Sequence, residues 1–155
     1  KAVNQWQLIC DADMSVDLIQ FEKWYNKNLI KSDKFAYYGS RNHIKSRIKT
    51  TFIRDYLGTI FTTILKILFK IEIKDTQCGF KVFNKNYSSR IFKRLSSYRF
   101  AFDVELTLIL KKNNIKIKEL PLKWTHKKNS KLSLIKDMPI MFYDILQIKI
   151  KEILK

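Results

Sequence analysis

The sequence predicts an α/β fold, because apolar segments of strand length alternate with longer segments that carry apolar residues at helical spacing. The predicted strands cover residues 6–10, 35–40, 81–83 and 115–124; the predicted helices begin near Ser15 and cover residues 52–69, 87–95, 102–112 and 137–155. This alternation favours helices packed around a mostly parallel sheet. These strands are few for an ordinary α/β domain, so we expect either an unusual fold or one whose first half is absent.

The first strand is the clearest element. Residues 6–10 (WQLIC) form a short apolar run that ends abruptly at Asp11 and Asp13. A buried strand that delivers acids at its carboxyl end has this pattern. From Ser15 onward the apolar residues take helical spacing, which predicts the first helix.

The middle of the chain continues the alternation. Residues 35–40 (FAYYGS) are mostly apolar and close on Gly39, as a strand before a turn does. Residues 45–51 are basic and polar, and residues 52–69 then carry a broad apolar helical face. The loop after this helix leads into the short strand predicted at residues 81–83.

The last strand and the last helix each carry an irregularity. The strand at residues 115–124 alternates, but its apolar phase shifts by one residue between Glu119 and Leu120, as in a bulged or edge strand. The final helix is amphipathic, and Pro139 lies near its start, where proline is tolerated.

Composition excludes several classes of protein. The chain has 155 residues, of which 46% are hydrophobic, too many for a disordered polyelectrolyte. Its 3 glycines and 2 prolines argue against collagen-like and turn-dense all-β folds. Cys10 and Cys78 form no CxxC pair, so neither a disulfide framework nor a cysteine zinc site is indicated.

The net charge of +17 favours a polyanionic partner: a nucleic acid, an anionic membrane or a phosphorylated substrate. The alternative is a general surplus of lysine as surface filler, because lysine recurs along the whole chain. No stretch reaches the ~20 apolar residues of a spanning helix, since Lys66 and Lys70 interrupt the longest one.

Asp11 and Asp13 form the sharpest candidate site. Two carboxylates at i and i+2 after a strand can both face the crevice where α/β proteins bind ligands. Such hard oxygen ligands suit Mg²⁺ or Mn²⁺, which bridge the phosphates of a nucleotide. The alternative is a solvated turn in which one aspartate caps the next helix.

Two further segments carry acids or amides. Asp75 and Gln77 lie in a loop beside Gly79, which permits close approach to a ligand, although the loop taken alone is ordinary. Asp103 and Glu105 lie at a helix start, where acids are also favoured for structural reasons.

A basic set follows the second strand. Arg41 ends the segment GSR, and Arg47, Lys49 and Arg54 come soon after it. Such a set can bind a phosphate through the forked donors of arginine, or it can form a solvated basic loop.

Taken in order, DAD, GSR, DTQCGFKVF, FAFDVEL and WTH-x₃-SKL closely resemble the dolichyl-phosphate β-glucosyltransferases, which are family-2 glycosyltransferases with the GT-A nucleotide-sugar fold. The resemblance runs from about residue 7 to about residue 150. DTQCGFK and FAFDVEL are specific, whereas DAD and GSR also occur in relatives such as the dolichyl-phosphate mannose synthases.

The resemblance implies roles position by position. Asp11 and Asp13 match the acids that bind the metal and the nucleotide, and Ser15 stands where some relatives have an amide ligand. Asp75 and Gln77 match a loop facing the reacting centre. Asp103 and Glu105 match a second acidic element, with a positional role. The residues implied to bind the acceptor phosphate are Arg41, with its next basic partner open among Arg47, Lys49 and Arg54, and also Ser130 and Lys131.

The implied reaction is the inverting transfer of glucose from UDP-glucose to dolichyl phosphate, for protein N-glycosylation, with Mg²⁺ or Mn²⁺ as cofactor. It implies an endoplasmic reticulum membrane location, with the catalytic face toward the cytosol. A phosphate monoester is already largely anionic at neutral pH and needs little general-base help. We therefore expect Asp75 to orient the site rather than to act as an obligatory base.

Family members begin with a membrane anchor and a first nucleotide-binding section, and neither is found in this sequence. We therefore expect residues 1–155 to be a single partial domain, the carboxyl-terminal part of such an enzyme, which lacks activity alone. Its catalytic part extends to about residue 136, and residues 137–155 form an amphipathic helix suited to a membrane surface.

Three other functions stay open. One is a sister transferase that uses GDP-mannose or a bacterial polyprenyl phosphate. Another is a basic nucleic-acid-binding module, with Phe35, Tyr37 and Tyr38 as stacking residues; it leaves the acidic loops unexplained, so we expect no nucleic acid partner. The last is a non-catalytic remnant at a membrane.

Overall fold

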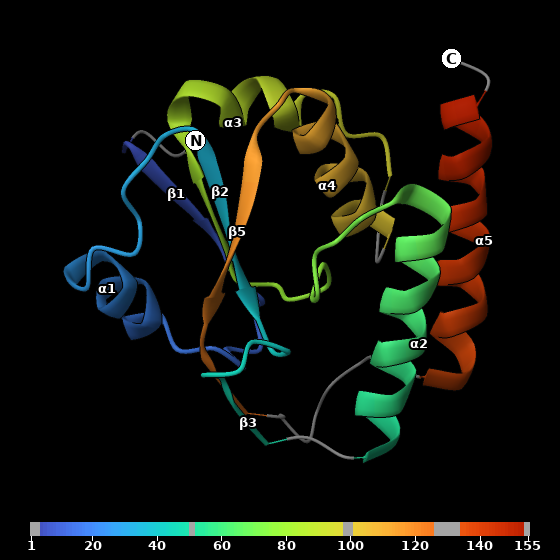
Figure 1. Ribbon diagram of the computed structural model, residues 1–155, viewed down its shortest axis with the longest axis horizontal. Helices are drawn as coiled ribbons and strands as arrows, with labels where there is room; N and C mark the ends of the chain where they lie inside the picture. The colour runs from blue at the N-terminus through green and yellow to red at the C-terminus, as the bar shows by residue number, and fades with distance from the viewer. Residues whose placement is uncertain (1–3, 50–51, 98–100, 126–133, 154–155) are drawn as a thin grey trace.

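The computed structural model describes residues 4–49, 52–97, 101–125 and 134–153, and it confirms the α/β class (Figure 1). A central sheet has the order β1 (Trp6–Ile9), β4 (Lys81–Asn84), β2 (Phe35–Ser40) and β5 (Lys116–Pro121). Strands β2 and β5 are parallel, whereas β4 is antiparallel to both of its neighbours.

The expectation of a mostly parallel sheet therefore needs correction, because the sheet is mixed. Strands β1, β2 and β5 run one way, and β4 runs between them in the other direction. The loop before β4 returns to the edge where β2 ends, since the amide of Gly39 donates to the carbonyl of Phe80 at 2.8 Å. The carboxyl ends of three strands and the start of β4 thus share one edge.

The strand predicted at residues 115–124 is divided into two strands. After β5 the chain continues as β6 (Lys123–Thr125), which pairs in parallel with β3 (Arg47–Lys49) in a separate small sheet. Leu122 lies between β5 and β6 and is buried. The phase shift at Glu119 and Leu120 marks this change of sheet, and the basic segment at residues 45–51 contains β3.

The predicted helices are all present. They are α1 (Ile19–Asn26), α2 (Phe52–Phe69), α3 (Lys85–Phe92), α4 (Phe102–Lys112) and α5 (Leu134–Ile153). The last helix begins earlier than the predicted start at residue 137, so Pro139 lies inside it. In the part of the chain that the structure describes, no helix combines the length and the apolarity that crossing a membrane requires.

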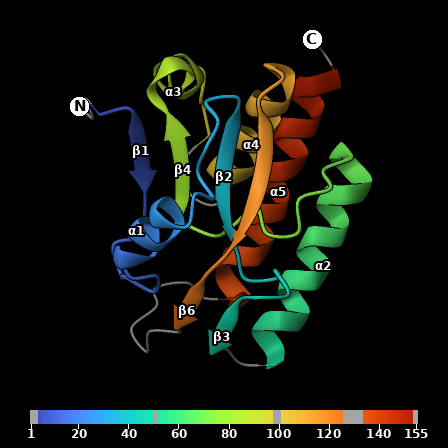
Figure 2. The same cartoon turned by 60° about the vertical axis from the view of Figure 1, so that its left-hand side comes forward.

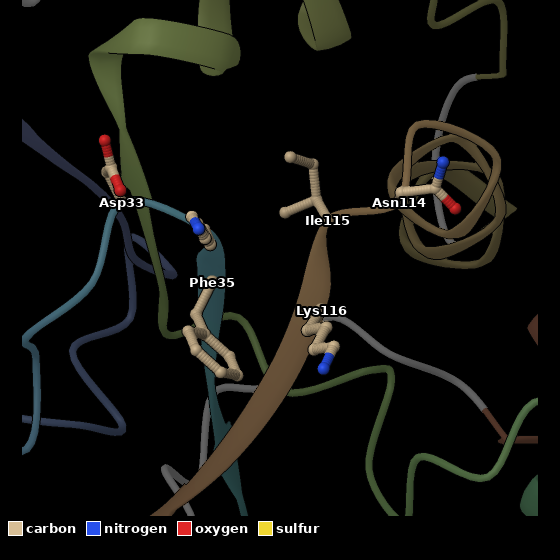
Figure 3. A pocket seen from close by; sticks show the side chains of 6 residues that line it. Asp33, Phe35, Asn114, Ile115 and Lys116 are labelled. Carbon is tan, nitrogen blue, oxygen red and sulfur yellow. The ribbon is translucent and has the colours of Figure 1, made fainter.

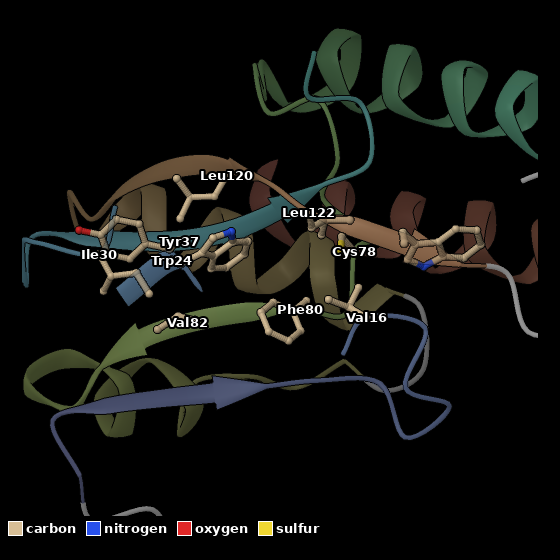
Figure 4. Packing of buried hydrophobic residues seen from close by; sticks show 10 residues of the cluster. Val16, Trp24, Ile30, Tyr37, Cys78, Phe80, Val82, Leu120 and Leu122 are labelled. Atoms are coloured by element: carbon tan, nitrogen blue, oxygen red, sulfur yellow. The ribbon is translucent and has the colours of Figure 1, made fainter. Parts of the chain in front are cut away.

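The core is divided by the sheet. Because side chains alternate along a strand, Tyr37 packs on one face with Trp24 of α1, as Figure 4 shows, while Tyr38 packs on the other face with residues of α3 and α4. A third apolar cluster joins α2, α4 and α5, with Leu65 and Ile145 almost fully buried in it. The helices thus cover the faces of the sheet and leave the edge where β1, β2 and β5 end to loops.

Candidate active site

Four of the motifs singled out in the sequence meet at this edge of the sheet (Figure 2). Asp11 follows β1, Arg41 follows β2, Lys81 opens β4, and Asp103 lies in the first turn of α4. The loop at residues 75–80 passes among them, and its contacts, described below, join all four. The edge is therefore the candidate active site.

Asp11 rests directly against Gly79. A Cβ built at Gly79 would overlap the carboxylate of Asp11, so only glycine allows this approach without a shift. Partial burial and the negative charge of Asp13 raise the pKa of Asp11, although Lys81 opposes the shift. Asp13 in turn accepts hydrogen bonds from the amide and the hydroxyl of Ser15, at 2.9 and 2.8 Å. The buried Ser15 thus orients Asp13.

Arg41 and Asp75 form a forked ion pair. The Nε and Nη2 atoms of Arg41 donate to Oδ2 and Oδ1 of Asp75, both at 2.8 Å, and the backbone amide of Arg41 donates to Oδ2 at 2.8 Å. Burial alone would raise the pKa of Asp75, but the charge and hydrogen bonds of Arg41 lower it below its usual value. The guanidinium also lies 5.8 Å from the ring centroid of Trp124.

Lys81 and Asp103 form a second ion pair, which is more deeply buried. Lys81 is 1% exposed; its Nζ donates to Oδ1 of Asp103 at 2.5 Å and to the carbonyl of Cys78 at 2.6 Å. The ammonium lies 5.0 Å from the ring centroid of Tyr38. Burial raises the pKa of Asp103 despite the nearby charge of Lys81. Sequence reasoning assigned no role to Lys81, although a lysine in a short apolar strand was a usable signal.

Glu119 is another residue that sequence reasoning missed. Its carboxylate accepts hydrogen bonds from the backbone amides of Lys74 and Asp75, both at 3.1 Å. The signal was the phase shift in the strand, where Glu119 replaces an apolar residue.

Other predicted residues stand apart from these pairs. Glu105 accepts hydrogen bonds from Ser96 and Ser97, which lower its pKa against the effect of burial, so only Asp103 of the second acidic element reaches the site. Gln77 lies in the site loop, and its Nε2 atom is buried without a hydrogen-bond partner among the described residues.

Of the predicted phosphate-binding residues, only Arg41 is seen to join the site. Arg47 is exposed on β3, and its backbone amide donates to the carbonyl of Leu122 at 2.9 Å. The side chains of Lys49 and Arg54, and all of Ser130 and Lys131, lie outside the described residues.

The site is acidic within a basic chain. The whole chain carries a net charge of +17, but the acids described above outnumber the cations Arg41 and Lys81 at the site. These acids are Asp11, Asp13, Asp75, Asp103 and Glu119. Within the described ranges, no group of three or more histidines, cysteines or acids forms a metal site. Proteins bind Mg²⁺ through one or two carboxylates plus substrate phosphates. Asp11 and Asp13 therefore fit a divalent cation that is shared with a phosphorylated ligand.

A separate hollow of about 320 Å³ lies at the opposite end of the sheet, where β2 and β5 begin (Figure 3). Its lining includes Asp33, Phe35 and Lys116, and none of the predicted site residues. The candidate site is therefore placed at the edge that carries Asp11 and Arg41, where the predicted motifs of the described residues meet.

No family model matches the chain. Curated relatives do match it, and three are named dolichyl-phosphate beta-glucosyltransferase: that of Dictyostelium discoideum is 34% identical over 97% of this chain, one from Trichomonas vaginalis 35% over 96%, and that of Saccharomyces cerevisiae 32% over 93%. These alignments cover 48%, 47% and 44% of the relatives.

These relatives place the chain among proteins related to glycosyltransferases. More particularly, the chain is a homologue of the dolichyl-phosphate β-glucosyltransferases, as its motifs predicted. It spans about half the length of the curated relatives it matches.

Proposed function

We propose that this chain forms the acceptor-binding part of an enzyme that transfers glucose from UDP-glucose to dolichyl phosphate with inversion. The observation that carries the proposal is the meeting of Asp11, Arg41 and Asp75 at one edge of the sheet. The names of the relatives support glucose as the transferred sugar and dolichyl phosphate as the acceptor. In this proposal the fold is of the GT-A type, the uracil base is held by strands beyond this chain, and the chain alone is inactive.

Arg41 is the proposed anchor of the acceptor phosphate. Its Nε and Nη2 atoms hold Asp75, which leaves Nη1 outside the pair, and its side chain keeps 35% exposure. An arginine edge of this kind suits a phosphate oxygen. Because the phosphate is already an anionic nucleophile, alignment matters more than proton removal.

Asp75 orients Arg41 in this mechanism. Both of its carboxylate oxygens accept hydrogen bonds from Arg41, and the side chain is 4% exposed. A carboxylate with a lowered pKa and filled hydrogen-bonding sites is a poor proton acceptor at neutral pH. Asp75 is therefore better suited to positioning than to general-base catalysis.

Asp11 and Asp13 would hold Mg²⁺ or Mn²⁺ together with the diphosphate of the donor. When bound, such an ion supplies charge stabilisation for the departing nucleotide. The chain contributes a carboxylate that Gly79 leaves room for and a second one that Ser15 orients. Burial and the charge of Asp13 raise the pKa of Asp11, and a bound cation would oppose both effects.

A membrane surface is the proposed location, on the cytosolic face of the endoplasmic reticulum. Helices α2 and α5 lie side by side (Figures 1 and 2), and both expose large apolar side chains. Those residues are Phe52, Tyr56 and Ile67 on α2, and Ile140, Tyr143, Leu146 and Ile150 on α5. Amphipathic helices with lysines beside apolar side chains suit a membrane interface, where a polyprenyl acceptor resides.

The test is a chimera of the Saccharomyces cerevisiae relative in which this chain replaces its matching segment. We expect membranes that contain the chimera to transfer glucose from UDP-glucose to dolichyl phosphate, and Arg41→Ala to reduce transfer at least tenfold. Arg90→Ala, an exposed arginine on α3, is the matched control and should leave transfer unchanged. Full transfer by the Arg41→Ala chimera, or an equal loss in the Arg90→Ala chimera, would contradict the proposal.

A further inference from the structure

Glu119 occupies a position where the strand pattern calls for an apolar side chain. Ile115, Ile117 and Glu119 alternate along one face of the chain, and the two isoleucines pack against the cluster that contains Tyr38. A carboxylate at such a position is costly unless hydrogen bonds satisfy it. Both of its oxygens find donors in the backbone of the site loop.

These contacts form a continuous chain to the candidate site. Oε2 of Glu119 accepts from the amide of Lys74 and Oε1 from the amide of Asp75, each at 3.1 Å. The carboxylate of Asp75 then accepts three hydrogen bonds from Arg41. Asn42, the neighbour of Arg41, also contacts this loop, because its Nδ2 donates to the carbonyl of Lys74 at 2.9 Å. Hydrogen bonds therefore connect the loop both to β5 and to the segment after β2.

We propose that Glu119 is a positioning residue for Arg41. By holding the backbone of Lys74 and Asp75, it sets where the Asp75 carboxylate lies, and the carboxylate in turn sets where the guanidinium lies. Glu119 acts through Asp75 and needs no contact with a substrate. The coupling of Glu119 to Arg41 stands on the geometry alone, whereas its effect on glucose transfer rests on the proposed function.

The first test measures hydrogen exchange and the Arg41 Nε–H signal by NMR in the intact 155-residue chain. Glu119→Gln replaces one carboxylate oxygen by an NH₂ group. This group is a donor and cannot accept the backbone N–H of Lys74 or Asp75 that faces it. We expect the Lys74 and Asp75 amides to exchange at least about tenfold faster and the Arg41 Nε–H signal to move. Lys118→Gln, an exposed neighbour on the same strand, should change neither. An unmoved Arg41 signal in a folded Glu119→Gln chain would overturn the proposal.

Glu119→Asp provides a second variant if the glutamine form does not fold. It keeps the charge but shortens the reach, so we expect faster exchange at Lys74 and Asp75 and a moved Arg41 signal. If the Lys74 and Asp75 amides exchange faster but the Arg41 Nε–H signal stays where it is in the unaltered chain, the coupling is equally refuted.

The second test uses the chimera. We expect Glu119→Gln to raise the KM for dolichyl phosphate about tenfold and to leave the KM for UDP-glucose unchanged. Lys118→Gln should change neither KM. If the chimera is active and Glu119→Gln leaves its KM for dolichyl phosphate unchanged, Glu119 has no positioning role in the reaction. A chimera without transfer before any substitution contradicts the proposed function instead, and the NMR result then decides the coupling.

Discussion

At the scale of single residues, the three glycines meet three different environments. A Cβ at Gly39 would collide with the buried Leu122 and lie 3.1 Å from the carbonyl of Phe80. One at Gly79 would overlap the carboxylate of Asp11, and one at Gly58, inside α2, would meet nothing within 4 Å. The same substitution therefore has three different consequences.

We expect Gly58→Ala to raise the free energy of unfolding by about 0.5–1 kcal/mol, because glycine is costly inside an exposed helix. Gly39→Ala should lower it by about 1–3 kcal/mol, because backbone and core atoms must move. Urea unfolding of the three chains measures both changes. A Gly39→Ala chain as stable as the original would contradict the packing described at the end of β2.

Gly79→Ala separates stability from ligand binding. The overlapping group is the far end of the Asp11 side chain, which can rotate away, so we expect a change in unfolding free energy of less than about 1 kcal/mol. The displaced carboxylate should weaken Mn²⁺ binding, measured by calorimetry in the presence of UDP-glucose in the chimera. Gly58→Ala is the control, and equal Mn²⁺ affinity in both variants would count against Asp11 as a ligand.

Asp75 predicts a pH dependence of stability. Its pKa is lowered in the folded chain, so the folded state holds the proton less tightly than the unfolded state does. Its stabilising contribution is therefore present above the unfolded pKa of about 3.9 and is lost as pH falls through the lower folded value. We expect Asp75→Asn to destabilise the chain at pH 7 and the difference from the unaltered chain to shrink below about pH 4. Urea unfolding across this range is the measurement, and a pH-independent difference would show that Asp75 titrates normally.

At the scale of elements, the Lys81–Asp103 pair joins β4 to α4 through the core. Tyr38 of β2 belongs to the same group, since its hydroxyl lies 3.3 Å from Oγ1 of Thr107 on α4. The Thr107 hydroxyl also donates to the carbonyl of Asp103 at 2.8 Å. The pair therefore sits inside a polar network that three elements share, between the site and the apolar cluster beneath it.

We expect Lys81→Met to lower the free energy of unfolding by up to about 3 kcal/mol, because it leaves the partly buried carboxylate of Asp103 without its cation. The double variant Lys81→Met with Asp103→Leu should recover much of this loss, since an apolar pair needs no desolvation of charge. Urea unfolding of the single and double variants gives the coupling. Additive losses would mean that the two side chains act independently.

At the scale of the whole molecule, the acids of the candidate site contrast with the apolar side chains exposed on α2 and α5. Further large apolar side chains are exposed elsewhere, at Met14, Leu18, Ile19, Tyr25 and Ile44. Figure 1 shows α1 on the other side of the sheet from these two helices. An exposed apolar surface on two adjacent amphipathic helices is what a protein needs if that face meets a membrane.

We expect the chain to co-sediment with vesicles that contain anionic lipid. Leu146→Glu with Ile150→Glu, both exposed on α5, should reduce binding several-fold without unfolding the chain. Ile19→Glu with Tyr25→Glu adds the same two charges at similarly exposed positions of α1, so this pair is the matched variant and should have a much smaller effect. Equal loss for both variants would indicate attraction by general charge and not by the α5 surface.

The secondary structure and much of the site were open to prediction because their signals are local. Strand-length apolar runs predicted β1 and β2, and the acids directly after β1 lie at the edge that carries the candidate site. The direction of β4 in the sheet was not predictable, because its sequence is compatible with a parallel or an antiparallel strand. Its antiparallel placement depends on where the loop at residues 70–80 returns.

The sequence by itself determined the alternation of elements, the candidate acids and Arg41, and the family resemblance, since each depends on residue type and order. Only the tertiary structure decided which groups act together: Asp75 with Arg41, Lys81 with Asp103, and Glu119 with the site loop. These partners lie 22 to 44 positions apart in sequence. A buried charge requires a partner, but periodicity does not name it, because distant segments are brought together by the packing of the sheet and its helices.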